Sequence, residues 1–256
     1  MSRLRGLLWW GAALTLAPLV LPLALHTRRT ALRLPPAAGP TEGLAGGEWP
    51  GEPLRLLVLG ESTVAGVGVE ELRQALPVQL ALALAQLQGR PVRWRACGEN
   101  GITAAQACER LLPLALGEPV DLAVLVFGVN DSTRLTSLAR WQQSLALMTE
   151  TLAARGARVA FTAVPPLQHF TALPWLLRRL LGVRAGLLDR QLMRLAGRFG
   201  SGHCPMDLQF SADYLARDGY HPSALGYRVW AEALAARLAQ GGIFRSPMNK
   251  PWRNPG

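Results

Sequence analysis

The chain has 256 residues, of which 50% are hydrophobic and 17% are charged, and this apolar content excludes an intrinsically disordered protein. Its formal net charge is +10, from 27 Lys and Arg against 17 Asp and Glu. Residues 1–40 and 244–256 hold eight of the basic residues and no acidic one, so 41–243 carries 19 basic against 17 acidic residues, a balance of +2. We expect no nucleic-acid partner, because no segment supplies a basic stripe interleaved with aromatic residues.

Residues 6–25 form an uncharged apolar run with arginines on both sides. At about 1.5 Å per residue, a helix of this length reaches across a hydrocarbon core of about 30 Å. Trp9 and Trp10 lie near one end of the run, where indole rings favour the membrane interface. We expect residues 1–32 to be a membrane anchor that contacts lipid through residues 6–25. The alternatives are a buried helix of a soluble protein and a cleaved signal peptide, although no good small-x-small cleavage site follows the run.

The rest of the chain divides into a linker, a domain and a tail. Residues 33–53 are rich in Pro, Gly and Glu, which predicts a linker, and 242–256 form a basic Pro-rich tail. Between them, residues 54–241 alternate apolar runs with stretches of helical period, which predicts an α/β domain whose parallel sheet of about five strands has helices on both faces. The expected strands are 54–60, 91–97, 120–128, 157–165 and, more weakly, 203–208; the expected helices are 70–88, 103–116, 138–155, 173–198 and 223–240.

In such sheets ligands bind beyond the carboxyl ends of the strands, so the residues after each strand are the candidate site. Gly60-Glu61-Ser62-Thr63 follows the first strand. It lacks the Gly-Lys-Ser/Thr of a phosphate-binding loop. Gly66-x-Gly68, which follows it, lacks the third glycine of a G-x-G-x-x-G dinucleotide-binding motif. Two interpretations of Ser62 remain: a nucleophile whose own backbone N–H faces a developing oxyanion, or a helix cap.

Three further segments support the first interpretation. A turn containing Gly101 follows the second strand, and Gly128-Val129-Asn130-Asp131 follows the third. Asp218-Gly219-Tyr220-His221-Pro222 precedes the last helix, and a carboxylate three residues before a histidine can orient its imidazole toward a serine. Taken singly, these residues also fit ordinary turns and a surface histidine. Together they favour a hydrolase site built from Ser62, Asp218 and His221.

These segments resemble, in order and spacing, the four blocks of the SGNH (GDSL-type) hydrolase family over roughly residues 54–240, and most resemble its bacterial thioesterase and lysophospholipase-like esterases. The resemblance implies a flavodoxin-like, three-layer αβα sandwich and ester hydrolysis with no cofactor and no metal. It implies Ser62 as nucleophile, His221 as base and Asp218 as its partner. The implied oxyanion hole comprises the Ser62 and Gly101 amides and the Asn130 side chain.

One residue departs from the family pattern: the usual Gly-Asp-Ser is here Gly-Glu-Ser. The family's Asp braces the nucleophile turn, so we expect the longer Glu61 to change local geometry more than activity. Cys97, Cys108 and Cys204 are an odd set without a C-x-x-C pair, and we expect buried thiols rather than disulfides or a zinc site.

The expected function is a serine esterase acting on acyl esters of the lipid or lysophospholipid type, anchored in a bacterial cell envelope or, if the signal is cleaved, secreted. Residues 165–186 are rich in Leu, Phe and Trp and include Arg178, Arg179 and Arg184. They predict either an acyl-chain wall or lid with its arginines near an anionic headgroup or membrane surface, or an ordinary packed helix. A saccharide O-acetyl esterase and a membrane-tethered binding module without catalysis are the alternatives.

Overall fold

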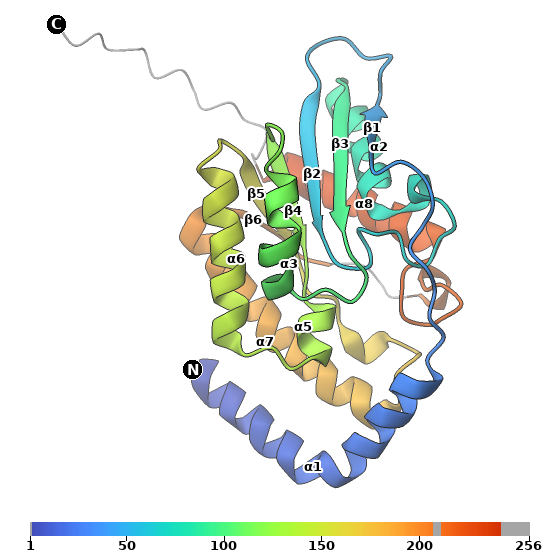
Figure 1. Ribbon diagram of the computed structural model, residues 1–256, viewed down its shortest axis with the longest axis vertical. Coiled ribbons are helices and arrows are strands. Elements are labelled where there is room, and N and C mark those ends of the chain that lie inside the picture. The colour runs from blue at the N-terminus through green and yellow to red at the C-terminus, as the bar shows by residue number, and fades with distance from the viewer. Residues whose placement is uncertain (1, 207–210, 242–256) are drawn as a thin grey trace, which may run out of the picture.

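The computed structural model describes residues 2–206 and 211–241, and within them the chain forms a six-stranded sheet (Figure 1). The strands are β1 (Glu42–Ala45), β2 (Leu54–Gly60), β3 (Val92–Gly98), β4 (Leu122–Val126), β5 (Arg158–Thr162) and β6 (Gly202–Cys204). Their order is β1-β3-β2-β4-β5-β6; β2 to β6 are parallel, and β1 is antiparallel to β3. The expected α/β fold with a mainly parallel sheet is confirmed, with one strand more than expected.

The extra strand corrects the prediction of a linker at 33–53. Residues Glu42–Ala45 pair with Val92–Arg95 of β3, and Ala45 is buried. Ala38 also forms a bridge with Glu71, ahead of the first domain helix. An edge strand of four residues needs few apolar side chains, so the Pro and Gly around it masked it in the sequence. This segment is part of the folded domain.

Helices pack on both faces of the sheet. One face is covered by α2 (Leu76–Gln88) and α8 (Ala224–Gln240), and the other by α3 (Ala104–Arg110), α6 (Leu138–Ala153) and α7 (Trp175–Phe199). In Figure 1, α3 and α6 lie in front of the sheet and α8 behind it. Strand β2 supplies both cores, with Leu57 and Leu59 on one face and Leu56 and Val58 on the other. Shorter elements are η1 (Leu72–Gln74), α4 (Leu112–Ala115), α5 (Val129–Thr133), η2 (Leu167–His169) and η3 (Ala212–Tyr214).

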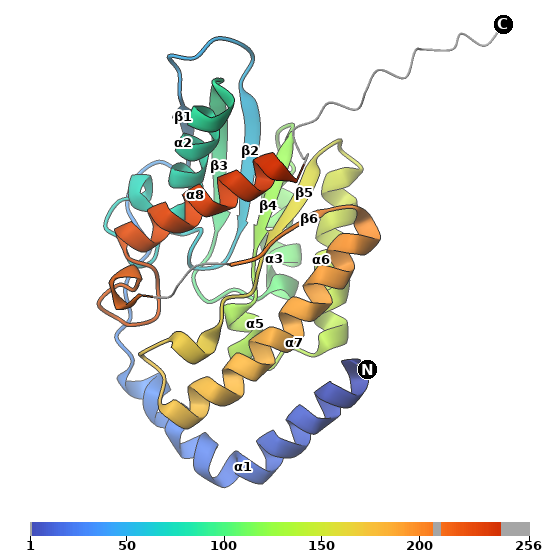
Figure 2. The ribbon, with the colours of Figure 1, turned by 180° about the vertical axis from the view of Figure 1, so that it is seen from behind.

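The N-terminal apolar run forms α1 (Ser2–Thr30), which is long and apolar enough to cross a membrane. Both ribbon views show α1 bent near its middle (Figures 1 and 2). Pro18 and Pro22 lie inside it, and each removes an i→i−4 hydrogen bond, which accounts for the bend. The helix lies against α7, where Trp9 Nε1 donates to the Leu180 carbonyl at 2.9 Å.

Candidate active site

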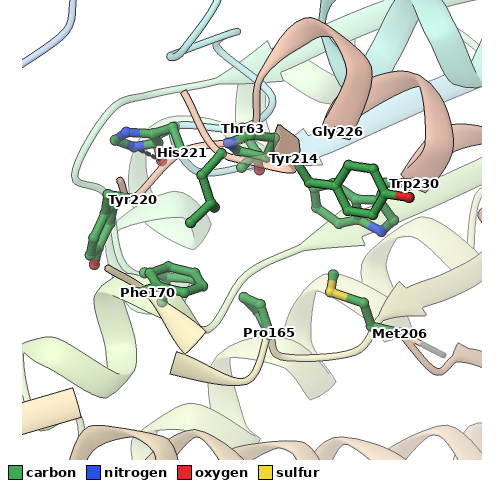
Figure 3. A pocket seen from close by; sticks show the side chains of 13 residues that line it. Thr63, Pro165, Phe170, Met206, Tyr214, Tyr220, His221, Gly226 and Trp230 are labelled. Carbon is green, nitrogen blue, oxygen red and sulfur yellow. Dashed lines mark hydrogen bonds between the residues drawn. The ribbon is translucent and has the colours of Figure 1, made fainter. Parts of the chain in front are cut away.

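The candidate site residues come from segments that follow adjacent strands or precede α8. Ser62 follows β2, Gly101 follows β3, and Asn130 lies in α5 directly after β4. Strand β2 is hydrogen-bonded to both β3 and β4, so the carboxyl ends of these three strands lie side by side. His221 comes from the loop before α8 and lines the same pocket as Ser62 (Figure 3).

Ser62, His221 and Asp218 are hydrogen-bonded in series. His221 Nε2 lies 3.0 Å from Ser62 Oγ, and His221 Nδ1 lies 2.6 Å from Asp218 Oδ2. The second carboxylate oxygen, Asp218 Oδ1, accepts the backbone N–H groups of Tyr220 and His221, both at 3.0 Å. Burial tends to raise the pKa of Asp218, but the hydrogen bonds from His221 and Tyr220 outweigh it and hold this pKa below its ordinary value. A charged Asp218 therefore fixes the imidazole so that its far nitrogen can take the Ser62 proton.

Glycines allow the close packing that places Ser62. A Cβ atom at Gly60 would overlap the Val126 carbonyl of the neighbouring strand, and one at Gly98 would overlap the backbone at Ala65. Gly219, with φ of +63°, makes the turn between Asp218 and His221 and packs against Thr171. The Ser62 and His221 turns therefore depend on positions where no side chain fits.

Glu61, the departure from the family pattern, is buried and binds the start of α5. Its carboxylate accepts the backbone N–H groups of Val129 and Asn130, both at 2.9 Å, and the Asn130 side-chain amide at 2.6 Å. Burial raises the pKa of Glu61 from 4.5 to about 8, outweighing these three donors, which favour the charged form. The Glu61 carboxyl group thus joins the Ser62 turn to Asn130.

Each predicted oxyanion donor has an N–H group that is free to bind a substrate oxygen. Asn130 Nδ2 carries two hydrogens, of which one is donated to Glu61. Among the hydrogen bonds of the described residues, the backbone N–H groups of Ser62 and Gly101 have no acceptor. Gly101 has φ of +80°, a left-handed conformation that favours glycine.

Asp131, for which the sequence suggested no role, braces the other side of this region. Its side chain is fully buried, and Oδ2 accepts the Ala104 N–H at 3.0 Å, which fixes the start of α3 just after Gly101. Burial raises the pKa of Asp131, and the charge of Arg184 is among the effects that oppose this rise. The donors flanking the candidate oxyanion site are therefore held from two sides, by Glu61 and by Asp131.

The expectation that Arg184 lies near a headgroup or a membrane surface is wrong. Its side chain is 1% exposed, donates to the Thr136 carbonyl and lies over the Trp9 ring, 5.1 Å from the ring centre. Arg178 is half-buried and Arg179 is exposed. From Trp175 on, residues 165–186 form part of α7, whose apolar side chains Leu177 and Leu181 pack in the core. Only the start of the segment, at Pro165 and Phe170, faces the site.

An apolar pocket opens beside Ser62 and His221 (Figure 3). Its walls are mostly apolar, and the space inside it that is open to a water-sized sphere is about 70 Å³. The sequence placed Pro165 and Phe170 at the site, and four other lining residues belong to the segments quoted for the candidate site residues: Thr63, Val129, Tyr220 and Pro222. Met206, Tyr214, Leu215 and Trp230 were missed, because their segments carry no motif. The lining side chains other than Ser62 and His221 are Thr63, Val129, Pro165, Phe170, Met206, Tyr214, Leu215, Tyr220, Pro222 and Trp230.

Other histidines and the cysteines lie elsewhere. His203 Nε2 is 3.0 Å from Asp189 Oδ1, an oxygen that also accepts the Val164 N–H, so this pair ties β6 to α7. Cys97, Cys108 and Cys204 are free thiols, of which Cys204 is buried. Within residues 2–206 and 211–241, no group of three His, Cys, Asp or Glu is placed to hold a metal ion.

A serine, a histidine and a carboxylate bonded in series beside an apolar pocket have the geometry found in serine hydrolases. Residues 58–229 match the model of the GDSL-like lipase/acylhydrolase family. The chain belongs to this family, and the resemblance noted in its sequence is confirmed.

Known proteins agree with this membership. A GDSL-like esterase of Mycobacterium tuberculosis is 30% identical over an alignment of 198 residues. The match covers 72% of this chain and 62% of that protein, so the chain spans less than two thirds of this relative. The crystal structure of TesA is 25% identical with a TM-score of 0.61, covering 73% of this chain and 99% of TesA. AlinE4, an SGNH-hydrolase family esterase, is 25% identical with a TM-score of 0.55, covering 74% of this chain and 97% of AlinE4. A lipase/acylhydrolase from Enterococcus faecalis shares the fold at 20% identity, with a TM-score of 0.59 over 73% of this chain and 96% of its own.

Proposed function

We propose that this chain is a serine esterase that hydrolyses carboxylic esters through Ser62, His221 and Asp218. The observation that carries the proposal is the series of two hydrogen bonds, 3.0 Å from Ser62 to His221 and 2.6 Å from His221 to Asp218. Membership in a family of lipases and acylhydrolases supports an enzyme over a binding module without catalysis.

The reaction follows from these contacts. Ser62 Oγ attacks the acyl carbonyl while His221 Nε2 takes its proton, and Asp218 stabilises the resulting imidazolium. His221 then gives the proton to the leaving alcohol, which departs and leaves the acyl group on Ser62. Water, deprotonated by His221, attacks this acyl-enzyme; the acid is released and Ser62 regains its proton.

Charge on the carbonyl oxygen is stabilised by three donors in this proposal: the Ser62 and Gly101 backbone N–H groups and the Asn130 side chain. One such donor contributes roughly 3–4 kcal/mol to the transition state. Glu61 accepts one N–H of the Asn130 amide, and this bond orients the amide before substrate arrives. Glu61 is a positioning residue here and takes no part in proton transfer.

The proposed substrates are acyl esters with an apolar acyl group, of the lipid or lysophospholipid type. Phe170, Met206, Leu215 and Trp230 line the pocket beside Ser62, and such side chains suit a hydrocarbon chain. The apolar helix α1 favours a protein bound to the membrane of a cell envelope; cleavage at this helix would instead give a secreted protein. A saccharide O-acetyl esterase is the alternative enzyme.

Hydrolysis of p-nitrophenyl esters from acetyl to dodecanoyl tests both parts of the proposal. We expect the specificity constant to rise with chain length, and Ser62→Ala to abolish activity on every ester. The matched control is Ser201→Ala, at a serine outside the pocket, and it should keep full activity. A preference for the acetyl ester would favour the saccharide esterase, and an active Ser62→Ala enzyme would remove Ser62 from the mechanism.

A further inference from the structure

The N-terminal helix α1 has two different faces in the structure, and they point to how it meets a membrane. We propose that α1 does not cross the bilayer but lies in the plane of its surface, with one face docked on α7 and the other in the lipid. This inference rests on the proposed membrane binding and specifies its form.

The docked face runs along the length of α1. The least exposed positions recur every three or four residues, as one stripe of a helix requires: Gly6, Trp9, Ala13, Leu16, Val20 and Ala24. Val20 is part of the same core as the α7 leucines, and Leu16 and Ala24 pack against that core. A helix that projected from the domain into a bilayer would contact the domain at one end only.

Polar contacts hold this docked face. Trp9 is 4% exposed, and its indole N–H donates to the Leu180 carbonyl of α7. Its ring also covers the guanidinium of the buried Arg184. A membrane-spanning α1 would have to leave α7, which would break this hydrogen bond and uncover the Arg184 side chain.

The opposite face of α1 is apolar and has no protein partner among the described residues. Its exposed side chains include Leu7, Leu8, Trp10, Leu14, Leu21 and Leu25, with Leu14 70% and Leu21 60% exposed. A helix that is apolar all round is normally buried on all sides. Soluble monomers rarely expose a continuous apolar patch of this kind, so the outer face requires a lipid environment.

Charges at both ends of α1 identify the lipid surface. Arg5, Arg28 and Arg29 are exposed, and residues 1–40 contain no acidic residue. Arginines beside an apolar helix face are attracted to anionic headgroups. The partner is therefore a bilayer that contains anionic lipid.

The position of α1 relates this surface to the candidate active site. Both ribbon views place α1 at the end of the molecule toward which the central strands run, beyond α5 (Figures 1 and 2). Ser62 and Asn130 follow strands at that same end. An in-plane α1 would thus hold the Ser62 end of the domain toward the membrane, where lipid esters are concentrated.

Flotation of the purified full-length chain with vesicles tests the outer face. The vesicles are phosphatidylcholine with or without about one third phosphatidylglycerol, and binding should be stronger with the anionic lipid and weaken with salt. We expect the double variant Leu14→Asp/Leu21→Asp to lose at least tenfold in vesicle affinity. The control is Leu87→Asp, at a leucine of α2 that is 55% exposed, and it should bind as the wild type does. Helix α2 lies at the end of the molecule away from α1 (Figure 1).

A pair of cysteines at the two ends of α1 separates in-plane from spanning helices. The Ser2→Cys/Ala31→Cys chain is reconstituted in sealed vesicles and treated with a membrane-impermeant maleimide. Intact-mass spectrometry then counts the labels on each molecule, after subtraction of the labels that the wild-type chain gains in the same treatment. An in-plane helix has both ends on one side of the membrane, so each molecule gains two labels or none. A spanning helix gives molecules with one label whichever way they insert.

Three results would overturn the inference: a population with one label, unchanged vesicle binding of Leu14→Asp/Leu21→Asp, or a dimer without vesicle binding, which would show that a second copy covers the outer face. Hydrolysis of a short soluble ester is measured on the same preparations. That activity depends on the proposed esterase site and not on α1, so it separates a failure of this inference from a failure of the proposed function.

Discussion

At the scale of single residues, the hydrogen bond between Glu61 and the Asn130 side chain joins the Ser62 turn to the proposed oxyanion hole. The positions of Ser62, Gly101 and Asn130 could be predicted because each follows a strand with a recognisable apolar run. The bonds of Glu61 to Val129 and Asn130 join residues 68 and 69 positions apart, and no local pattern encodes them. The burial of Arg184 was missed for the same reason, since its partners Trp9 and Thr136 lie far away in the sequence.

Asn130→Ala tests the proposed oxyanion hole. Loss of one donor to the developing oxyanion should lower kcat by about two to three orders of magnitude with a much smaller change in KM. The measurement is steady-state hydrolysis of a soluble ester, with a melting curve to verify folding, because Glu61 also loses a hydrogen-bond donor in this variant. Unchanged turnover would exclude Asn130 from the mechanism.

The pH dependence of Tm, compared between the wild type and Glu61→Gln, tests whether burial raises the pKa of the Glu61 carboxyl group. The pKa of Glu61 is raised to about 8 in the folded protein, so folding favours its protonated form. The stability that this proton provides is complete below about pH 4.5 and is lost as pH rises through about 8. The Tm of the wild type should therefore fall relative to that of Glu61→Gln between about pH 5 and pH 8.5. A constant difference in Tm over that range would contradict the raised pKa.

At the scale of elements, the regular alternation of strands and helices was predictable and the edges of the domain were not. Strand β2 coincides with the predicted run at 54–60, and α8 begins within a residue of the predicted start. Strand β1 was missed because four residues among Pro and Gly carry no clear period. The predicted tail at 242–256 and the last residues of the predicted strand at 203–208 lie outside the described residues.

The docking of α1 on α7 can be tested with two adjacent tryptophans. Trp9 is buried against α7, whereas Trp10 is 41% exposed on the same helix. We expect Trp9→Ala to release α1, so that a protease cuts within residues 2–30 at least tenfold faster, while the activity on a soluble ester is retained. Trp10→Ala keeps the docked contacts and should be cut at the wild-type rate. Equal cutting rates for the two variants would argue against docking through Trp9.

At the scale of the whole molecule, a nearly neutral domain lies between two basic ends of the chain. The net charge of +2 over 41–243 leaves the rest of the +10 at the two ends, and the arginines near residues 6–25 flank an apolar helix. The sequence indicated an anchor from this run alone. How α1 lies on the domain depended on contacts with α7, which only the folded chain brings together.

The central claim is that Ser62 is a nucleophile activated by His221. The most direct measurement is peptide mapping after treatment with a fluorophosphonate, which reacts only with an activated serine. The account predicts one adduct per chain, on the peptide that contains Ser62, and no adduct in His221→Ala because nothing then removes the Ser62 proton. An adduct on another serine, or an unlabelled wild-type chain with native folding, would contradict it.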